Sequence, residues 1–255
     1  MKLRYLLTGA ALLIAVSAPA SAVNIAVFGD NATDNFINST YGAGSATLVS
    51  DAQLATAGFL SPFNAFFMTR NGSSFGVGLS AAAAANVNAY VGATGAVILM
   101  NCDCADGVGS EAFLNQLFTN AVDLAAASGH GYIGEFNGAV SALTANGNGF
   151  NPIGLITGIA GSLGGGGGGS AGSFTLSNAS PLLTGLTLPN NSGFVEFGAS
   201  ITGVNSALVV ARYDDQGPAL IFREGIDRNA VPEPVSLGLV GLGLAALGWS
   251  RRKKA

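Results

Sequence analysis

Short apolar runs alternate with helical stretches over the first half of the chain. Each run is flanked by Gly, Asn or Asp and predicts a buried β-strand, at residues 23–28, 46–49, 63–69, 96–100 and 131–134. The segments between them predict helices at residues 34–41, 52–57, 81–91, 110–127 and 136–144, with Asp51 and Ser80 as N-caps and Glu111 in a first turn. Strands that alternate with helices in this way are typical of βαβ units and a parallel sheet.

The pattern changes after residue 150. An unbroken run of glycines at residues 164–169 predicts a flexible loop, which we place at residues 161–173. Further on, residues 194–200, 207–213 and 218–223 have the composition of strands, and Asp214-Asp215-Gln216-Gly217 predicts a hairpin turn between the last two. We therefore expect an α/β domain over residues 23–228, with a doubly wound, mostly parallel sheet that antiparallel C-terminal strands extend at one edge.

The first 22 residues have the three regions of a secretory signal peptide. Lys2 and Arg4 form a basic region, residues 6–16 are apolar, and Ala20-Ser21-Ala22 is a cleavage site of small residues. We expect the signal peptidase to cut after Ala22 once the chain has entered the secretion translocon. The mature domain would then fold outside the cytoplasm.

The C-terminal stretch, residues 229–255, also has three parts. Pro232-Glu233-Pro234 comes first, an uncharged apolar run follows at residues 235–249, and then come four cations, Arg251, Arg252, Lys253 and Lys254. The run predicts a single membrane helix, although its fifteen residues fall short of the ~20 of an untilted span. The cations are expected to stay in the cytoplasm.

This order of parts resembles the PEP-CTERM sorting signal of Gram-negative, exopolysaccharide-producing bacteria. The resemblance implies processing by an exosortase, a membrane enzyme that cuts near Pro232-Glu233-Pro234 and releases or re-attaches the protein. It implies transient anchoring in the inner membrane, and then residence in the cell envelope, at the surface or outside the cell. The alternative is an ordinary tail anchor, which has no need of Pro-Glu-Pro and is usually longer.

The charge of the predicted domain limits its partners. Between the two terminal segments, thirteen carboxylates stand against four arginines, and there is no lysine. This acidic balance excludes nucleic-acid binding through a basic surface. The two cysteines, Cys102 and Cys104, are two residues apart, so a disulfide between them would be strained and we expect a reduced or transiently oxidised pair.

Two segments resemble the class I glutamine amidotransferase-like superfamily, which has a flavodoxin-like fold. They are residues 128–136, which contain Gly134-Glu135-Phe136, and residues 178–186. In that superfamily a cysteine nucleophile occupies the turn after the strand, and a histidine follows downstream. Here the turn has no cysteine and no histidine follows it. The resemblance therefore implies the fold without the activity.

The alternative is a secreted hydrolase. Gly72-Ser73-Ser74-Phe75-Gly76 matches the G-x-S-x-G pattern, and Ser74, Asp103 or Asp106, and His130 follow one another in α/β-hydrolase order. A nucleophile elbow needs a strand that runs directly into the serine and a helix that leaves it at once. The predicted strand ends before Arg70 and the predicted helix begins after Ser80, so a plain polar loop is the simpler interpretation.

Carboxylates follow three of the predicted strands. Asp30 and Asp34 follow the first, Asp103 and Asp106 the fourth, and Glu135 the fifth. Because ligands bind at the carboxyl ends of strands in a doubly wound sheet, these oxygens could collect Ca²⁺. They are also common turn and cap residues for purely local reasons.

Taken together, these patterns predict an exported, exosortase-processed protein of the cell surface or extracellular matrix. Its domain would be non-catalytic, without a resident cofactor, and associated with exopolysaccharide or another surface component. The alternatives are the hydrolase that uses Ser74 and His130, and a calcium-dependent carbohydrate-binding module.

Overall fold

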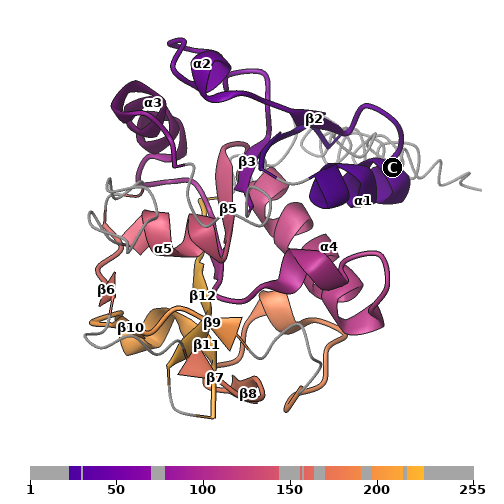
Figure 1. Cartoon of the computed structure of the whole chain (residues 1–255), viewed down its shortest axis with the longest axis vertical. Helices are drawn as coiled ribbons and strands as arrows, with labels where there is room; N and C mark the ends of the chain where they lie inside the picture. Colours follow the sequence, from indigo (N-terminus) through magenta and orange to yellow (C-terminus); the bar gives the residue numbers. More distant parts are fainter. Residues whose placement is uncertain are drawn as a thin grey trace, which may run out of the picture.

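A mixed sheet of eight strands lies between two layers of helices (Figure 1). The computed structural model describes residues 23–29, 31–69, 78–143, 156, 158–163, 170–190, 197–214 and 217–226. The strand order is β2-β1-β3-β5-β4-β12-β11-β8. Five strands are parallel, namely β1 (Ile25–Phe28), β2 (Ala46–Leu48), β3 (Ala65–Met68), β4 (Val97–Met100) and β5 (Gly131–Glu135).

The other three strands run antiparallel to their neighbours. They are β12 (Pro218–Arg223), which pairs with β4, β11 (Val209–Arg212) and β8 (Thr175–Leu176). The structure thus confirms the α/β class, the mostly parallel sheet and its extension by antiparallel C-terminal strands. It also confirms the antiparallel pairing of β11 with β12, whereas residues 215 and 216 of the predicted turn lie outside the described residues.

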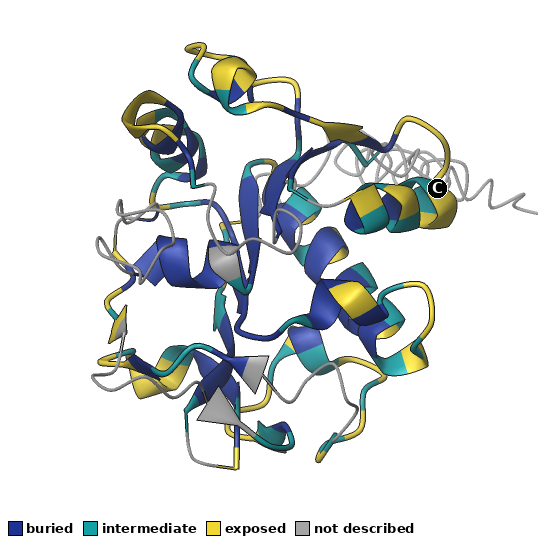
Figure 2. Ribbon diagram, viewed as in Figure 1, coloured by how far each residue is buried: buried dark blue, intermediate teal, exposed yellow. Residues whose placement is uncertain are grey.

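Successive strand residues point into two separate cores, as the period of two requires. Ile25, Val27 and Phe67 pack under α1 (Asn31–Tyr41) and α4 (Ala112–Ala127). Ala26, Phe28 and Phe66 pack under α2 (Asp51–Leu54), α3 (Ala81–Val91) and α5 (Asn137–Leu143). Figure 2 shows the result, a buried sheet with helices whose outer faces are exposed.

The order of the parallel strands is β2-β1-β3-β5-β4, whereas the flavodoxin-like order is 2-1-3-4-5. Here β5 lies between β3 and β4, so the structure differs from the flavodoxin-like arrangement that the resemblance implied. The crossover connections between the parallel strands nevertheless all have the same handedness. Those through α1 and α4 lead one way across the sheet, and those through α2 and α3 lead the other way over the opposite face.

The bounds of two elements agree with the sequence, whereas the roles predicted for Asp51 and Glu111 at helix starts do not. The predicted bounds of α3 and β12 are confirmed residue for residue, including Ser80 as the N-cap of α3. The N-cap of α2 is Ser50 rather than Asp51, because Ser50 and Gln53 form a reciprocal capping box. Glu111 is the N-cap residue of α4, not a member of its first turn, and its side chain makes no capping bond.

Strand pairing extends into both edges of the predicted glycine-rich loop. Both flanks of residues 164–169 form two-residue strands: β6 (Ser162–Leu163) pairs with β10 (Ile201–Thr202), and β7 (Ser170–Ala171) pairs with β9 (Phe197–Gly198). The prediction of one loop over residues 161–173 is therefore wrong at its edges, because backbone pairing with residues 197–202 orders them. The strand predicted at residues 194–200 joins β7 rather than the main sheet.

Among the described residues, no helix combines the length and the apolar character needed to cross a membrane. The helix predicted at residues 235–249 and the signal peptide at residues 1–22 lie outside the described residues.

Candidate functional site

A tight turn at Phe136 joins β5 to α5. Phe136 occupies this turn with φ of 33° and is the one described residue other than glycine with positive φ. Its N–H donates to the Met100 carbonyl at 2.8 Å, and its own carbonyl accepts from Val140 at 2.9 Å. A strained residue between a strand and a helix, in the pattern Gly134-Glu135-Phe136-Asn137-Gly138, has the geometry of a nucleophile elbow.

Both glycines of this pattern are required by close packing. A Cβ on Gly134 would lie 2.6 Å from the carbonyl carbon of Gly138, and a Cβ on Gly138 would clash with the Met68 carbonyl oxygen. The hydroxyl of Tyr132 donates to the Gly138 carbonyl at 2.7 Å. The elbow is thus built like a catalytic one, but a benzyl group occupies the position from which a nucleophile would act.

Glu135, one residue before the elbow, is fully buried. Its Oε1 accepts a hydrogen bond of 3.3 Å from the N–H of Ala105, in the 3-10 turn η1 (Cys104–Gly107). A buried carboxylate is costly unless hydrogen-bonded, so this contact ties the end of β5 to the turn after β4. Glu135, which the sequence predicted as a cation ligand, therefore links β5 to η1 through a hydrogen bond.

The two cysteines form a disulfide, Cys102–Cys104, so the prediction of a reduced or transiently oxidised pair is wrong. The turn after β4 brings their Cα atoms to 5.1 Å, within the range that disulfides ordinarily span. Both cysteines are fully buried.

Asn101, directly after β4, connects three segments of the chain. Its Nδ2 donates to the carbonyls of Ala199 and Pro218, both at 2.8 Å, and its Oδ1 accepts from the N–H of Ala199 at 2.8 Å. Its carbonyl accepts a short hydrogen bond from the Tyr213 hydroxyl. These hydrogen bonds join the end of β4 to Ala199, to Pro218 at the start of β12 and to Tyr213.

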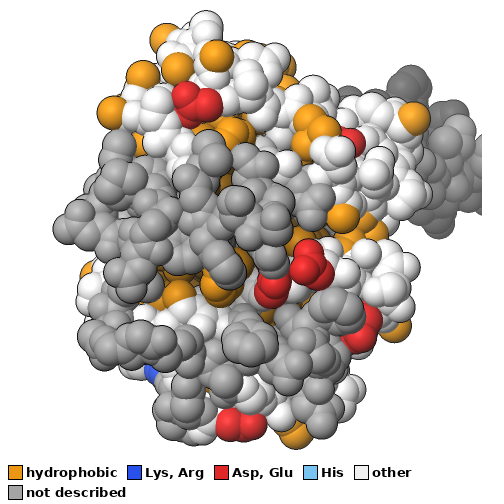
Figure 3. Space-filling view, in the orientation of Figure 1, with side chains coloured by type: hydrophobic (Ala, Val, Ile, Leu, Met, Phe, Trp, Pro, Cys, Tyr) orange, Lys and Arg blue, Asp and Glu red, His pale blue; other side chains and the backbone are white. Residues whose placement is uncertain are grey.

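The predicted calcium ligands lie in different environments. Asp34 is half-buried on α1, and burial raises its pKa although Asn38 donates a hydrogen bond to it. Asp103 is half-buried, Asp106 is exposed and Glu135 is buried, while Asp30 lies outside the described residues. Among the described residues, no three His, Cys, Asp or Glu side chains are grouped so that they could hold a metal ion. Figure 3 shows acidic side chains at several places on this face, with two groups close together near its centre.

His130 lies at the other end of the sheet. It precedes β5, and its Nε2 is 2.8 Å from the Thr94 hydroxyl, while Tyr90 packs against its ring. Asp103 and Asp106 follow β4, which is parallel to β5, so about 16 Å of strand separates them from His130. The structure does not bring His130 together with either aspartate, and Ser74 lies outside the described residues.

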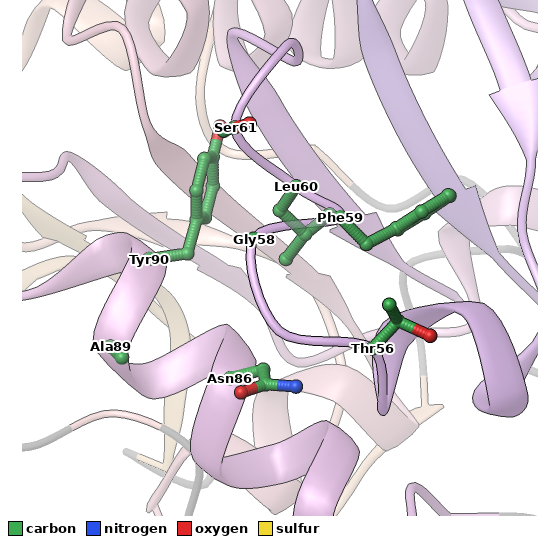
Figure 4. A pocket seen from close by; sticks show the side chains of 8 residues that line it. All are labelled: Thr56, Gly58, Phe59, Leu60, Ser61, Asn86, Ala89 and Tyr90. Carbon is green, nitrogen blue, oxygen red and sulfur yellow. The ribbon is translucent and has the colours of Figure 1, made fainter.

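A cavity of about 250 Å³ lies between α3 and the loop that leads from α2 to β3. Its lining combines apolar groups with amide and hydroxyl groups, and contains no charged side chain: Thr56, Gly58, Phe59, Leu60, Ser61, Asn86, Ala89 and Tyr90. In Figure 4 the Tyr90 ring rises from the helix toward Ser61, while Phe59 extends away from α3. Tyr90 is fixed by a hydrogen bond of 2.9 Å from its hydroxyl to the Phe63 carbonyl.

The comparisons with known proteins identify the C-terminal segment. Residues 230–253 match the family model described as the PEP-CTERM protein-sorting motif. This span contains Pro232, Glu233, Pro234, Arg251 and Arg252, all outside the described residues. No curated protein and no solved structure matches the chain significantly. The motif implies export to the cell envelope or surface and processing by an exosortase.

Sequence reasoning missed the residues that organise the carboxyl end of the sheet. Asn101 and Tyr213 were not singled out, because an amide after a strand looks like an ordinary turn residue. The cavity beside α3 was also missed, since its lining comes from a loop and a helix some thirty residues apart.

Proposed function

We propose that the protein is an exported surface or matrix protein whose α/β domain binds exopolysaccharide without reacting with it. The sorting motif at residues 230–253 carries this proposal, because it implies export to the cell envelope or surface, where the domain would meet exopolysaccharide. Signal peptidase and the secretion translocon would act first. The apolar run at residues 235–249 would then hold the protein transiently in the inner membrane until the exosortase cuts near Glu233.

The composition of the elbow supports a binding role. Phe136 stands where catalytic elbows carry a nucleophile, and Glu135 is engaged with the Ala105 backbone. The amide and hydroxyl groups of Asn101 and Tyr213 are likewise engaged in hydrogen bonds within the fold. These hydrogen bonds position backbone segments at the carboxyl end of the parallel strands.

The neutral cavity beside α3 is where we expect a sugar ring to bind. Aromatic and aliphatic groups from Tyr90 and Leu60 suit the apolar face of a pyranose. Asn86 and Thr56 each donate a side-chain hydrogen, to the carbonyls of Leu54 and Ala52, so their oxygens would act as acceptors for the sugar hydroxyls, beside the hydroxyl of Ser61. The cavity volume of about 250 Å³ lies below the range of drug-sized pockets, in keeping with one ring of a longer polymer.

A matched pair of substitutions on α3 tests this assignment. Ala89 and Ala85 are both exposed, but only Ala89 lines the cavity. Ala89→Trp should fill the cavity and weaken binding to isolated exopolysaccharide about tenfold or more, whereas Ala85→Trp should bind like the wild type. Co-sedimentation of the processed protein with the polymer measures both. Equal binding by the two variants, or none by the wild type, would contradict the proposal.

Co-sedimentation with a chelator tests the first alternative, and a hydrolysis assay tests the second. A calcium-dependent module that uses Asp30, Asp34, Asp103, Asp106 and Glu135 would lose binding in a chelator and regain it with Ca²⁺. A hydrolase that uses Ser74 and His130 would cleave generic esters or glycans, and His130→Ala would abolish that activity. We expect binding without calcium, and no hydrolysis that depends on His130.

A further inference from the structure

The described part of the domain ends at the amino end of the parallel strands. Because β12 is antiparallel to β4, its last residue, Arg223, pairs with Val97 at the start of β4. The Arg223 guanidinium donates to the carbonyls of Gly92 and Gly95 at 3.0 and 3.1 Å. The N–H of Ile226 donates to the Thr94 carbonyl at 2.8 Å. The chain is therefore fixed to this end of the domain as far as Ile226.

Very little chain separates this fixed point from the sorting motif. Pro232 follows Ile226 by six residues, which span about 20 Å even when fully extended. A domain of this size has a radius of gyration of about 17 Å. The segment from Ile226 to Pro232, which we call the tether, is thus about as long as the radius of gyration of the domain. The domain therefore cannot turn its far end toward an enzyme that holds Pro232-Glu233-Pro234.

The surface around this fixed point contains a hollow of about 160 Å³. Leu124 and Ala127 at the end of α4, Phe222 on β12, and residues that follow or precede these elements line the hollow: Ser128, Glu224, Gly225 and Ala96. Phe222 and Leu124 are half-buried and Glu224 is exposed, and the neighbouring Ile226 is 63% exposed. The hollow therefore offers an apolar floor with one carboxylate at its rim.

We infer that this amino-end surface docks on the exosortase while the sorting motif occupies the enzyme. The inference rests on processing by an exosortase. The hollow suits an apolar side chain from the enzyme, with a cation beside it for Glu224. A bilayer is the less suitable occupant, because a domain with thirteen carboxylates and four arginines is not attracted to anionic lipid. The opposite end, with Phe136 and Asn101, faces away from the membrane during processing.

Photo-cross-linking in cells tests the contact directly. A photo-reactive amino acid replaces Ala127 at the hollow, or, as the control, Ala82 in the first turn of α3 at the carboxyl end of the sheet; both alanines are exposed. The full chain is produced together with its exosortase. We expect cross-links to the exosortase from position 127 and none from position 82. Cross-links to lipid alone, or equal cross-links from both positions, would overturn the inference.

Processing rates provide the second measurement. Ala127→Trp should slow C-terminal cleavage roughly fivefold or more, and Ala82→Trp should leave it unchanged. Twenty Gly and Ser residues inserted after Arg228 add about 25 Å of flexible chain, so Ala127→Trp should no longer slow cleavage. Equal rates for the two tryptophan variants would contradict docking. A wild-type chain left uncut beside an active exosortase would instead overturn the processing on which the inference rests.

Discussion

The side chain of Asn101 pairs with the backbone of Ala199 as a strand would. Oδ1 accepts from the Ala199 N–H and Nδ2 donates to the Ala199 carbonyl, both at 2.8 Å, across 98 residues of sequence. The fully buried amide thus joins the end of β4 to the segment between β9 and β10. This relationship explains how short strands late in the chain are held against the parallel sheet.

Removal of this amide should destabilise the domain strongly. Asn101→Ala leaves the N–H and carbonyl of Ala199 without their partner and opens a cavity, and we expect a loss of about 3 kcal/mol in the free energy of unfolding. Urea denaturation of the processed protein measures it. Asn38→Ala removes an amide whose hydrogen bonds reach Asp34, Gly44 and Ala46, and serves as the control. It should cost less, because Asn38 is half-buried and water can replace part of these bonds. An Asn101→Ala variant as stable as that control would contradict the role assigned to Asn101.

At position 136 a glycine variant should be more stable than an alanine variant, the reverse of the usual order. Phe136→Ala and Phe136→Gly both remove the ring, but only alanine keeps a Cβ at φ of 33°. We therefore expect the glycine variant to be more stable than the alanine variant by about 1 kcal/mol, although glycine ordinarily raises the entropy of the unfolded chain. Thermal unfolding of the two variants side by side decides it. A more stable alanine variant would show that the turn is not strained.

The Cys102–Cys104 disulfide should be inert in the folded protein. Both cysteines are fully buried, so a reductant followed by an alkylating agent should label neither until a denaturant is added. Mass spectrometry of the intact protein counts the added groups. A loop this short removes little chain entropy, so we expect the Cys102→Ser, Cys104→Ser double variant to lose about 1.5 kcal/mol from this source. Labelling without denaturant would contradict the burial of the pair.

One fully buried tyrosine, Tyr132, and two half-buried ones, Tyr41 and Tyr90, should make the fold sensitive to alkali. Burial raises the pKa of Tyr41, Tyr90 and Tyr132 above the ordinary value of about 10, and for Tyr41 the hydrogen bond to Asp123 and its charge add to the effect. Because the unfolded chain loses these protons first, the stability they contribute is complete below about pH 10 and falls as the pH rises further. Denaturant titrations at a series of pH values test this dependence.

The control for this pH dependence is Tyr132→Phe, which removes one of the three groups. Its stability should be lower at neutral pH, because the Gly138 carbonyl loses a hydrogen bond of 2.7 Å, but it should fall less steeply in alkali. A slope equal to that of the wild type would show that Tyr132 does not titrate with unfolding.

Local elements of the fold were predictable because local residues determine them. Ser80 followed by an alanine run fixes α3, and an apolar segment after a turn fixes β12. The capping box of Ser50 and Gln53 was equally readable, although Asp51 was predicted in its place. The strand order was not readable, because the place of β5 between β3 and β4 depends on contacts between distant segments.

The same distinction applies to the candidate site. The turn at Gly134-Glu135-Phe136 could be recognised from its glycines, but the contact of Glu135 with Ala105 depends on how β4 and β5 lie in the sheet. His130 and Asp103 suited a catalytic order along the chain, yet parallel strands place them at opposite ends. Chain order cannot show this, because it carries no information on which end of a strand a residue occupies.

We propose that residues 230–253 direct the protein to an exosortase, which removes the C-terminal segment. Intact mass spectrometry of the protein recovered from the cell surface or medium tests it most directly, with Glu233→Ala as the comparison. We predict a wild-type chain that begins at Val23 and ends near Pro232-Glu233-Pro234, and a variant that keeps its C-terminal segment in the membrane. Mature surface protein that still contains Trp249 and Arg251 would contradict the account.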